Sequence, residues 1–180
     1  MTTQEAKQKM KDMLTKIRSA EFMLPLVQST HNKQVTRIFV KKLASDGIEI
    51  GKYSEEENGL YINPTTNIGS FAGQGKNGDK VFKSGAKHKT KYFVNYKAYR
   101  AAINKDTTSV NLRMTELLKI DYTNGLRFSD GAVISTVNSE RNAVVISALI
   151  EKYGDRTFKL STEEQKELQT KFVNKTKTLL

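Results

Sequence analysis

The feature that most constrains the fold is a long polar segment, residues 73–106, that is rich in Gly and Lys. From Lys76 to Lys105 this segment holds nine Lys and Arg residues but only one acidic residue, Asp79, so it supplies eight of the eleven net positive charges of the chain. Like charges at this density repel one another, and the pattern therefore predicts a segment that does not form a compact core. Such a segment needs an anionic partner, a neighbouring subunit or open solvent.

The rest of the composition fits one domain, or one domain with an extended arm. A hydrophobic content of 37% in 180 residues predicts a modest core. Cys is absent and only two His are present, which excludes disulfides, thiolate metal sites and Cys nucleophiles and disfavours a His-rich metal centre. No stretch has the apolar length of a membrane span, and no secretion leader is expected. The isoelectric point near 9.7 favours nucleic acid or an acidic protein surface as partner, although positive charge also confers solubility.

Hydrophobic periodicity predicts two helices before the basic segment. Apolar residues recur at three- and four-residue steps over 4–20 and again over 26–43. Pro25 lies between these stretches, so we expect it to mark the junction of the two helices. Residues 48–53 alternate in polarity and predict a short strand. Residues 54–90 show no sustained period and predict a long arm or loop.

Regular structure is predicted again after the arm. Residues 96–103 are expected to form a short helix, and residues 112–118 have turn or helix character. Three apolar stretches then follow, separated by two strong tight-turn signals, and they predict an antiparallel meander. The expected strands are 117–122, 125–128 and 132–137.

Two helices complete the predicted fold. The first spans 140–153 and is expected to bury its apolar side chains, Val144 and Ala148 among them, and the second opens with a capping box at Ser161–Glu164. The fold class is therefore α+β: N-terminal helices, a long basic extended arm, and a small antiparallel sheet with two C-terminal helices packed on it. The expected division of the chain is 1–53 for the N-terminal helices and short strand, 54–91 for the basic arm, and 92–180 for an α+β body that forms a single domain with 1–53.

No arrangement of residues points to a catalytic site. Gly73–Gly78 matches the G-x-G-x-x-G pattern but lacks the strand before it and the helix after it, so a flexible loop is the better interpretation. His88 lies among lysines, and His31 is expected on the polar face of a helix. Neither His has acidic neighbours at metal-ligand spacing. No nucleophile–base pair is evident, and we predict that the chain is not an enzyme and takes no metal or cofactor.

The basic segment interleaves lysines with aromatic residues, which allows two interpretations. The aromatics pack on a neighbouring subunit while the lysines stay solvated, or the lysines lie near duplex phosphates without reading the sequence; both remain open. Stacking of single strands on the aromatics also fits the pattern, whereas the scarcity of Arg argues against specific base readout. The candidate site residues are the lysines Lys76, Lys80, Lys83, Lys87, Lys89 and Lys91 as DNA-facing or partner-contacting groups, and Tyr92, Phe93, Tyr96 and Tyr99 as an oligomer interface.

Four stretches carry a resemblance to a known family: Ile48–Ser54, Lys91–Arg100, Val110–Leu118 and Ile150–Glu164. Together with the Gly- and Lys-rich arm, they make the chain similar to the neck proteins of tailed bacteriophages. It most resembles the ring or tail-completion components that join portal to tail in crAss-like phages. Similar chains often carry Thr-Gly-x-Leu where this chain has Glu116 in the place of Gly.

The resemblance implies a structural function. It implies a virion protein of the head–tail connector, made in the host cytoplasm, whose copies form a homo-oligomeric ring between the portal and other neck or tail proteins. Such a ring surrounds passing double-stranded DNA without sequence specificity and has no membrane partner or cofactor. The alternative is a basic, non-specific nucleic-acid-binding module. An enzyme with an unrecognised site is a third reading, which the missing Cys and sparse His disfavour.

Overall fold

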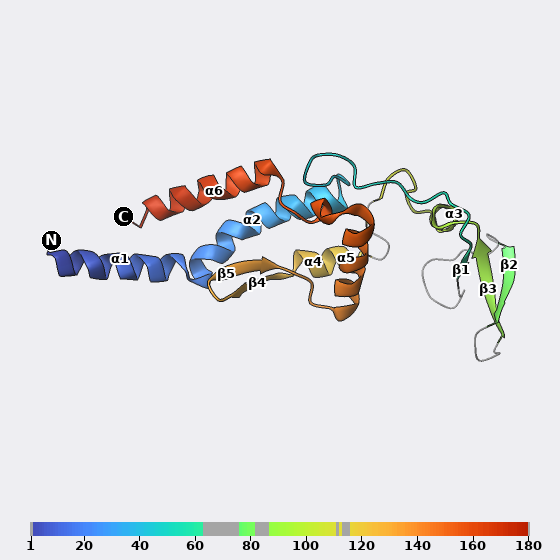
Figure 1. Cartoon of the computed structure of the whole chain (residues 1–180), viewed down its shortest axis with the longest axis horizontal. Helices are drawn as coiled ribbons and strands as arrows, with labels where there is room; N and C mark the ends of the chain where they lie inside the picture. Colours follow the sequence, from blue (N-terminus) through green and yellow to red (C-terminus); the bar gives the residue numbers. More distant parts are fainter. Residues whose placement is uncertain (1, 63–75, 82–86, 111, 113–115, 180) are drawn as a thin grey trace. The chain divides into compact units, whose positions relative to one another are not determined.

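A computed structural model of the chain describes residues 2–62, 76–81, 87–110, 112 and 116–179 (Figure 1). Its fold is mixed α+β, as the sequence predicts. The chain divides into two compact units: unit 1 comprises Met1–Ile50 and Glu116–Leu180, and unit 2 comprises Gly51–Thr115. Residues 92–115, which are expected in the body with the helices, fall in unit 2.

Unit 1 begins with helices α1 (Thr3–Ile17) and α2 (Ala20–Phe39). The break between them lies at Ser19, whose hydroxyl accepts a hydrogen bond from the N–H of Phe22 and so caps α2. The sequence predicts the junction at Pro25, but Pro25 lies inside α2. A proline near the start of a helix removes one backbone hydrogen bond without ending the helix, so the cap at Ser19 sets the boundary.

Helix α2 is the centre of unit 1. It buries Phe22, Leu26, Val35, Ile38 and Phe39. It packs against α6, against α4, and against an antiparallel hairpin, with α6 and the hairpin on different sides of α2 in Figure 1. The sequence predicts that the C-terminal helices cover the sheet, whereas here α2 covers the hairpin and α6 packs on α2. The bounds of these elements are α4 Leu117–Thr123, β4 Leu126–Ser129, β5 Ala132–Ser135 and α6 Thr162–Lys177.

Two predicted strands take another form. Residues 117–122 belong to helix α4, so the predicted three-stranded meander is a two-stranded hairpin of β4 and β5. The helix places Leu118 and Tyr122 one turn apart on the same side, where both are buried. A strand would put Ile120 on the same face as these two residues, but Ile120 is exposed here. Within 43–50, pairing is limited to a single bridge between Leu43 and Glu49 in place of the predicted strand.

Helix α5 (Glu140–Tyr153) starts and ends where the sequence predicts. Its first turn is held by Asp121 of α4, whose carboxylate accepts hydrogen bonds from the N–H groups of Asn138 and Ser139 and from the Asn142 amide. These bonds, that of Asn142 most of all, lower the pKa of Asp121. The predicted burial of α5 is wrong, because none of its residues is buried. A short 3-10 helix, η1 (Asp155–Thr157), follows α5.

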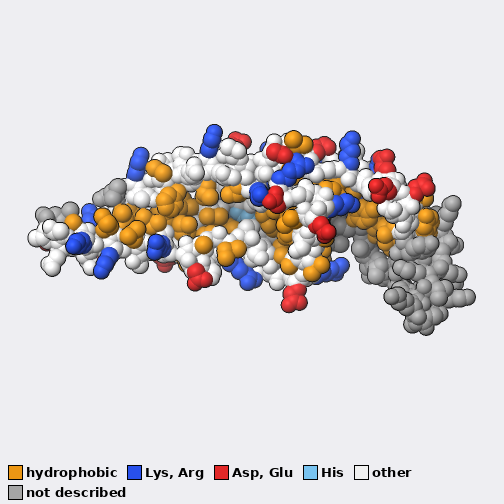
Figure 2. Space-filling view, viewed as in Figure 1, with side chains coloured by type: hydrophobic (Ala, Val, Ile, Leu, Met, Phe, Trp, Pro, Cys, Tyr) orange, Lys and Arg blue, Asp and Glu red, His pale blue; other side chains and the backbone are white. Residues whose placement is uncertain are grey.

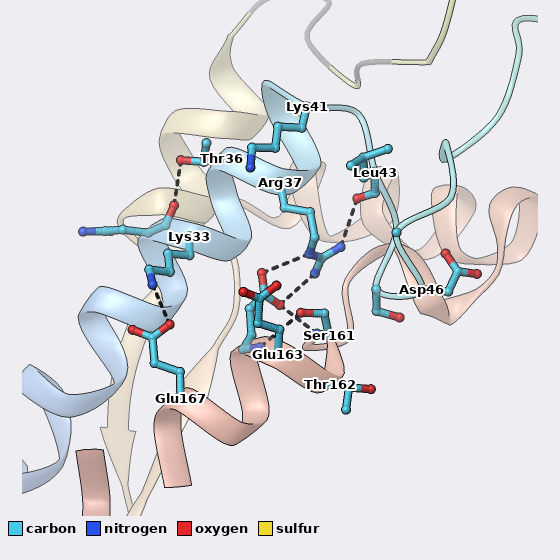
Figure 3. A pocket seen from close by; sticks show the side chains of 14 residues that line it. Lys33, Thr36, Arg37, Lys41, Leu43, Asp46, Ser161, Thr162, Glu163 and Glu167 are labelled. Carbon is cyan, nitrogen blue, oxygen red and sulfur yellow. Dashed lines mark hydrogen bonds and ion pairs between the residues drawn. The ribbon is translucent and has the colours of Figure 1, made fainter. Parts of the chain in front are cut away.

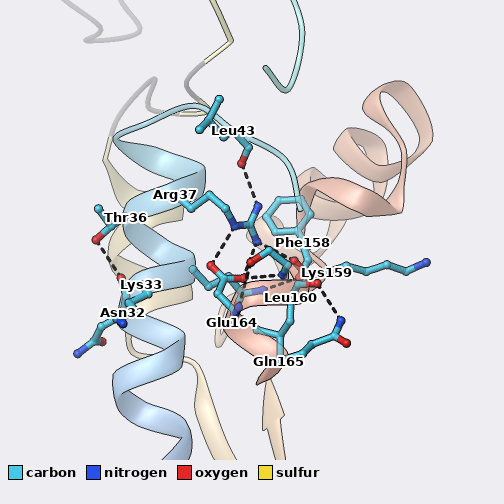
Figure 4. Close-up of polar contacts among 12 residues, drawn as sticks. Asn32, Lys33, Thr36, Arg37, Leu43, Phe158, Lys159, Leu160, Glu164 and Gln165 are labelled. Carbon is cyan, nitrogen blue, oxygen red and sulfur yellow. Dashed lines mark hydrogen bonds and ion pairs between the residues drawn. The ribbon is translucent and has the colours of Figure 1, made fainter. Parts of the chain in front are cut away.

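A buried ion pair joins α2 to α6 (Figure 4). Arg37 donates from Nε to Glu164 Oε1 at 3.0 Å and from Nη2 to Glu164 Oε2 at 3.2 Å. Its other bonds go to the carbonyls of Leu43 and Lys159, at 2.9 and 2.7 Å. Glu164 also accepts from the Ser161 N–H at 2.7 Å, which completes the predicted capping box. Both charges are therefore well satisfied, as burial requires.

His31 lies in the core of unit 1 rather than on the predicted polar face of its helix. Its Nε2 lies 2.9 Å from the carbonyl oxygen of Tyr122, to which it donates in the Nε2-protonated tautomer, and its ring packs on the Tyr122 ring. The polar neighbours of His31 in the sequence do not reveal this burial, because α4 and β5 cover α2 from positions about a hundred residues away.

Unit 2 contains a three-stranded antiparallel sheet of order β1-β3-β2 and a short helix. The sequence predicts no regular structure over 54–90, yet the described parts of this segment include strands. The side-chain pattern does not predict the β2–β3 pairing, because backbone hydrogen bonds form it and the strands have no stripe of apolar side chains. The elements are β1 Leu60–Ile62, β2 Lys76–Val81, β3 Lys87–Phe93 and α3 Tyr96–Ala102.

Candidate functional site

Five of the six candidate lysines belong to two paired strands of unit 2. The register sets Lys76 opposite Tyr92, Asn77 opposite Lys91 and Lys80 opposite His88. Successive residues of a strand belong to opposite faces, and cross-strand partners share a face. Positions 87, 89 and 91 therefore share one face of the sheet, and positions 76 and 80 belong to the other. The hairpin thus distributes its lysine positions over both faces, and Lys83 lies outside the described residues.

Two of the four predicted interface aromatics form the core of unit 2. Phe93 and Tyr99 are buried together with Ala102 and Ile103, and their ring centroids lie 5.3 Å apart. Leu60 and Ile62 of β1 pack against the same cluster. Burial raises the pKa of the Tyr99 hydroxyl. These two rings hold β1, β3 and α3 together within one chain, so they offer no open surface to a second subunit.

The other two aromatics are more accessible. Tyr96 is 37% exposed, and its ring lies 5.6 Å from that of Tyr53 and 6.0 Å from that of Tyr99. Tyr92 is half-buried, with its ring over Gly59: a Cβ at Gly59 would come within 3.0 Å of Tyr92 Cε2, and the φ of +62° also favours glycine there. A subunit interface at these rings stays a prediction, and Tyr96 is the ring best placed for it.

Two positive charges of the basic segment are compensated inside unit 2. The Arg100 side chain is only 1% exposed, its guanidinium lies 4.4 Å from the centre of the Tyr53 ring, and its Nε donates to the Asp106 carbonyl at 2.9 Å. Lys97 forms an ion pair with Glu55 that lowers the pKa of that carboxyl. The prediction that this whole segment needs an external partner is therefore wrong for Lys97 and Arg100.

Unit 1 has a polar cavity of about 740 Å³ between the second half of α2 and the start of α6 (Figure 3). Lys33 Nζ lies 2.5 Å from Glu167 Oε2, and Glu167 also pairs with Lys171 at 2.6 Å. The bonds from Lys171 and Lys33 lower the pKa of Glu167, and the bond to Glu167 raises the pKa of Lys33. The residues that line this cavity include no His. The shifts of Lys33 and Glu167 both move their pKa values away from neutrality, whereas a general acid or base works best with a pKa near the working pH.

His31 and Ser135 form a contact that the sequence does not indicate. The Ser135 hydroxyl lies 3.4 Å from His31 Nδ1, which is longer than a good hydrogen bond. Because His31 is buried and its other nitrogen is bonded to Tyr122, we interpret it as a satisfied core histidine rather than a general base. Among the described residues, no group of three or more His, Asp or Glu side chains is placed to hold a metal ion. No helix in the described ranges has the length and apolar character to cross a membrane.

The apolar side chains that helices of unit 1 leave exposed are the feature that sequence reasoning missed. Met10 is 61% exposed on α1 and Val144 is 70% exposed on α5. Figure 2 shows hydrophobic side chains gathered over α1 and the adjoining part of α2. An apolar cleft of about 290 Å³ lies between α2 and α6. The periodicity of α1 and α5 indicates an apolar face on each helix, but it does not show whether the same chain covers that face.

Comparison with known proteins finds no match for this chain among protein-family models, curated proteins or solved structures. Its function is therefore inferred from its own sequence and surfaces.

Proposed function

We propose that the chain is a non-enzymatic structural subunit of a phage head–tail connector, whose copies form a homo-oligomeric ring around the DNA channel between portal and tail. The observation that supports this most is that α1 and α5 bury no residue although each carries an apolar face. Soluble monomers rarely leave such surfaces open, so these helices are suited to contacts with other protein chains. The resemblance of four sequence stretches to phage neck proteins suggests that this assembly is a phage connector.

The basic hairpin of β2 and β3 fits a ring that surrounds duplex DNA. Its lysine positions occupy both faces of the sheet, so they do not form the single stripe that a groove-reading element would present. Lysines near a duplex attract phosphates at any sequence, and the attraction fades over about 8 Å at physiological salt. The hairpin would therefore favour the presence of DNA in the channel without holding it at one register.

The native mass of the purified protein tests this proposal. We expect mass photometry to show discrete oligomers that grow from monomers with concentration, and negative-stain images to show closed rings. Immunogold labelling of virions should place the protein at the neck. A strict monomer that labels no virion would overturn the proposal.

A basic nucleic-acid-binding module is the second candidate, and the charge of the hairpin favours it. The two readings differ in salt-dependent DNA binding by the free chain. A connector subunit should bind duplex DNA weakly, with affinity that falls steeply as salt rises, and the change Lys87→Gln with Lys89→Gln should weaken this binding equally on all sequences. Tight binding by a monomer would favour the module instead.

A further inference from the structure

We infer that the exposed face of α1 in one copy packs, head to tail, against the exposed face of α5 in the next copy. This contact rests on the proposed homo-oligomer and names the two surfaces that build it. Both helices belong to unit 1, and neither has a buried residue.

The exposed face of α1 combines apolar and basic side chains. Lys7, Met10, Lys11 and Leu14 follow the i, i+3, i+4, i+7 spacing of one helix face. Met10 and Leu14 are among the exposed large hydrophobic residues, while Met13, on the neighbouring side, lines a crevice with Thr178 and Leu179 of the same chain. The acidic residues of α1, Glu5 and Asp12, lie on the opposite side of the helix. A partner for this face must be apolar at its centre and acidic at its border.

The exposed face of α5 has this character. Glu140, Val144, Ala148 and Glu151 lie on one side of the helix, at spacings of three and four residues. All four are exposed, and Val144 is the most exposed of the large hydrophobic side chains. Ala148 is small, so the backbone of a second helix can approach closely and longer side chains such as Met10 and Leu14 find room. Glu140 and Glu151 lie along one edge of this face, and Arg141 and Lys152 lie along the other. The lysines of a partner helix would therefore lie along the edge with the two glutamates.

Charge selects the pairing of α1 with α5 over the pairing of α1 with itself. Two copies of α1 would bring Lys7 and Lys11 against the same lysines, which is unfavourable. None of Lys7, Lys11, Glu140 and Glu151 forms an ion pair in the described part of the chain. An α1–α5 contact can therefore pair charges that have no ion-pair partner among the described residues.

A contact between two different surfaces of the same chain repeats from copy to copy. Such a heterologous contact closes into a ring when the rotation per copy allows it and otherwise gives a filament. One helix pair buries less than the roughly 1,200–2,000 Å² of a stable interface, so a single contact is weak and closure of the ring stabilises the assembly. This predicts monomers at low concentration and closed oligomers at high concentration.

Two double variants test the contact. One removes the apolar centre of the α1 face by Met10→Gln with Leu14→Gln, and the other removes that of the α5 face by Val144→Gln with Ala148→Gln. Gln is a good helix former and carries no charge, and the replaced residues are exposed, so both variants should fold as the wild type does by circular dichroism. Ile134→Gln, at an exposed apolar residue of β5, is the matched control.

We expect each double variant alone to stay monomeric in sedimentation velocity at concentrations where the wild type and the Ile134→Gln control form oligomers. A one-to-one mixture of the two double variants keeps one intact α1 face and one intact α5 face, and it can form only one contact, so at the highest soluble concentration it should give a heterodimer that does not grow further. If the wild type assembles but either double variant assembles equally well, or their mixture forms no heterodimer even at its highest soluble concentration, this contact is wrong while the proposed oligomer stands. If the wild type is monomeric at its highest soluble concentration, the proposed oligomer and this contact both fail.

Discussion

The two units of the molecule depart from their sequence patterns in opposite directions. In unit 1 the apolar periodicity of α5 predicts burial, yet none of its residues is fully buried and Val144 is 70% exposed. In unit 2 the charge of residues 73–106 predicts a segment without a compact core, yet Phe93, Tyr99 and Arg100 are buried there. A helix can carry an apolar face that only a partner covers, and a charged segment can contain a small core. Hydropathy therefore identifies apolar surfaces that are expected to be buried, and the tertiary structure shows which of them are buried within the same chain.

The largest expected effect concerns the aromatic core of unit 2. Phe93→Ala should destabilise that unit by about 3–5 kcal/mol, because it leaves a cavity between β3 and α3. Hydrogen exchange should then become fast in unit 2 while α2 and α6 of unit 1 stay protected. The matched control is Tyr96→Ala, at a partly exposed ring, which should change exchange much less. Equal effects of the two substitutions would show that burial of Phe93 does not hold unit 2 together.

The next effect concerns the buried ion pair of unit 1. Arg37→Met leaves the Glu164 carboxylate buried without its partner and should cost about 3 kcal/mol of unfolding free energy, measured by urea denaturation. The stability of unit 2 should be unaffected, because Arg37 and Glu164 both belong to unit 1. The double variant Arg37→Met with Glu164→Gln carries no buried charge and should recover part of the loss. Failure to recover any of it would mean that the packing of the arginine stem, rather than its charge, matters most.

A smaller, stabilising effect is expected at the start of α4. Glu116 has φ of +63°, in the left-handed region that favours glycine. Glu116→Gly should raise the unfolding free energy by about 1 kcal/mol, because a Cβ is unfavourable at this φ. Lys119→Gly, inside the same helix, should instead lower it by about 1 kcal/mol. A loss of stability in both variants would contradict backbone strain at Glu116.

The smallest effect is a pH dependence at the start of α5. The pKa of Asp121 is held below the usual value of an aspartate, chiefly by the Asn142 amide and then by the backbone N–H groups of Asn138 and Ser139. The folded state therefore favours the ionised carboxylate, and its stabilising effect is complete above the unfolded pKa and is lost as pH falls through the lower, folded pKa. Asp121→Asn should be less stable than the wild type at pH 7, and the difference should disappear in acid. A difference that persists at pH 2 would point to a shape effect rather than to ionisation.

Several features of the fold follow from short stretches of sequence. The capping box of Ser161 and Glu164 starts α6, and both of its bonds join residues three positions apart. The Ser-Asp-Gly signal between β4 and β5 gives Asp130 and Gly131 positive φ angles, as a type I′ turn requires. The bounds of α5 are equally local, since Gly154 follows its last turn. These signals depend on neighbouring residues only, so the sequence is enough to read them.

Burial and pairing were decided by the tertiary structure. His31 is buried because Tyr122 and Ser135, 91 and 104 positions away, lie against it. Arg37 meets Glu164 across 127 positions, and no local pattern connects them. The strands β2 and β3 pair through backbone groups that every residue except proline carries in full, so their side chains give little sign of the register. By itself the sequence determined the bounds of α5, the start of α6, the turn between β4 and β5, and which residues are apolar or charged. Only the fold decided which of those residues meet, because burial depends on residues that are close in space and distant along the chain.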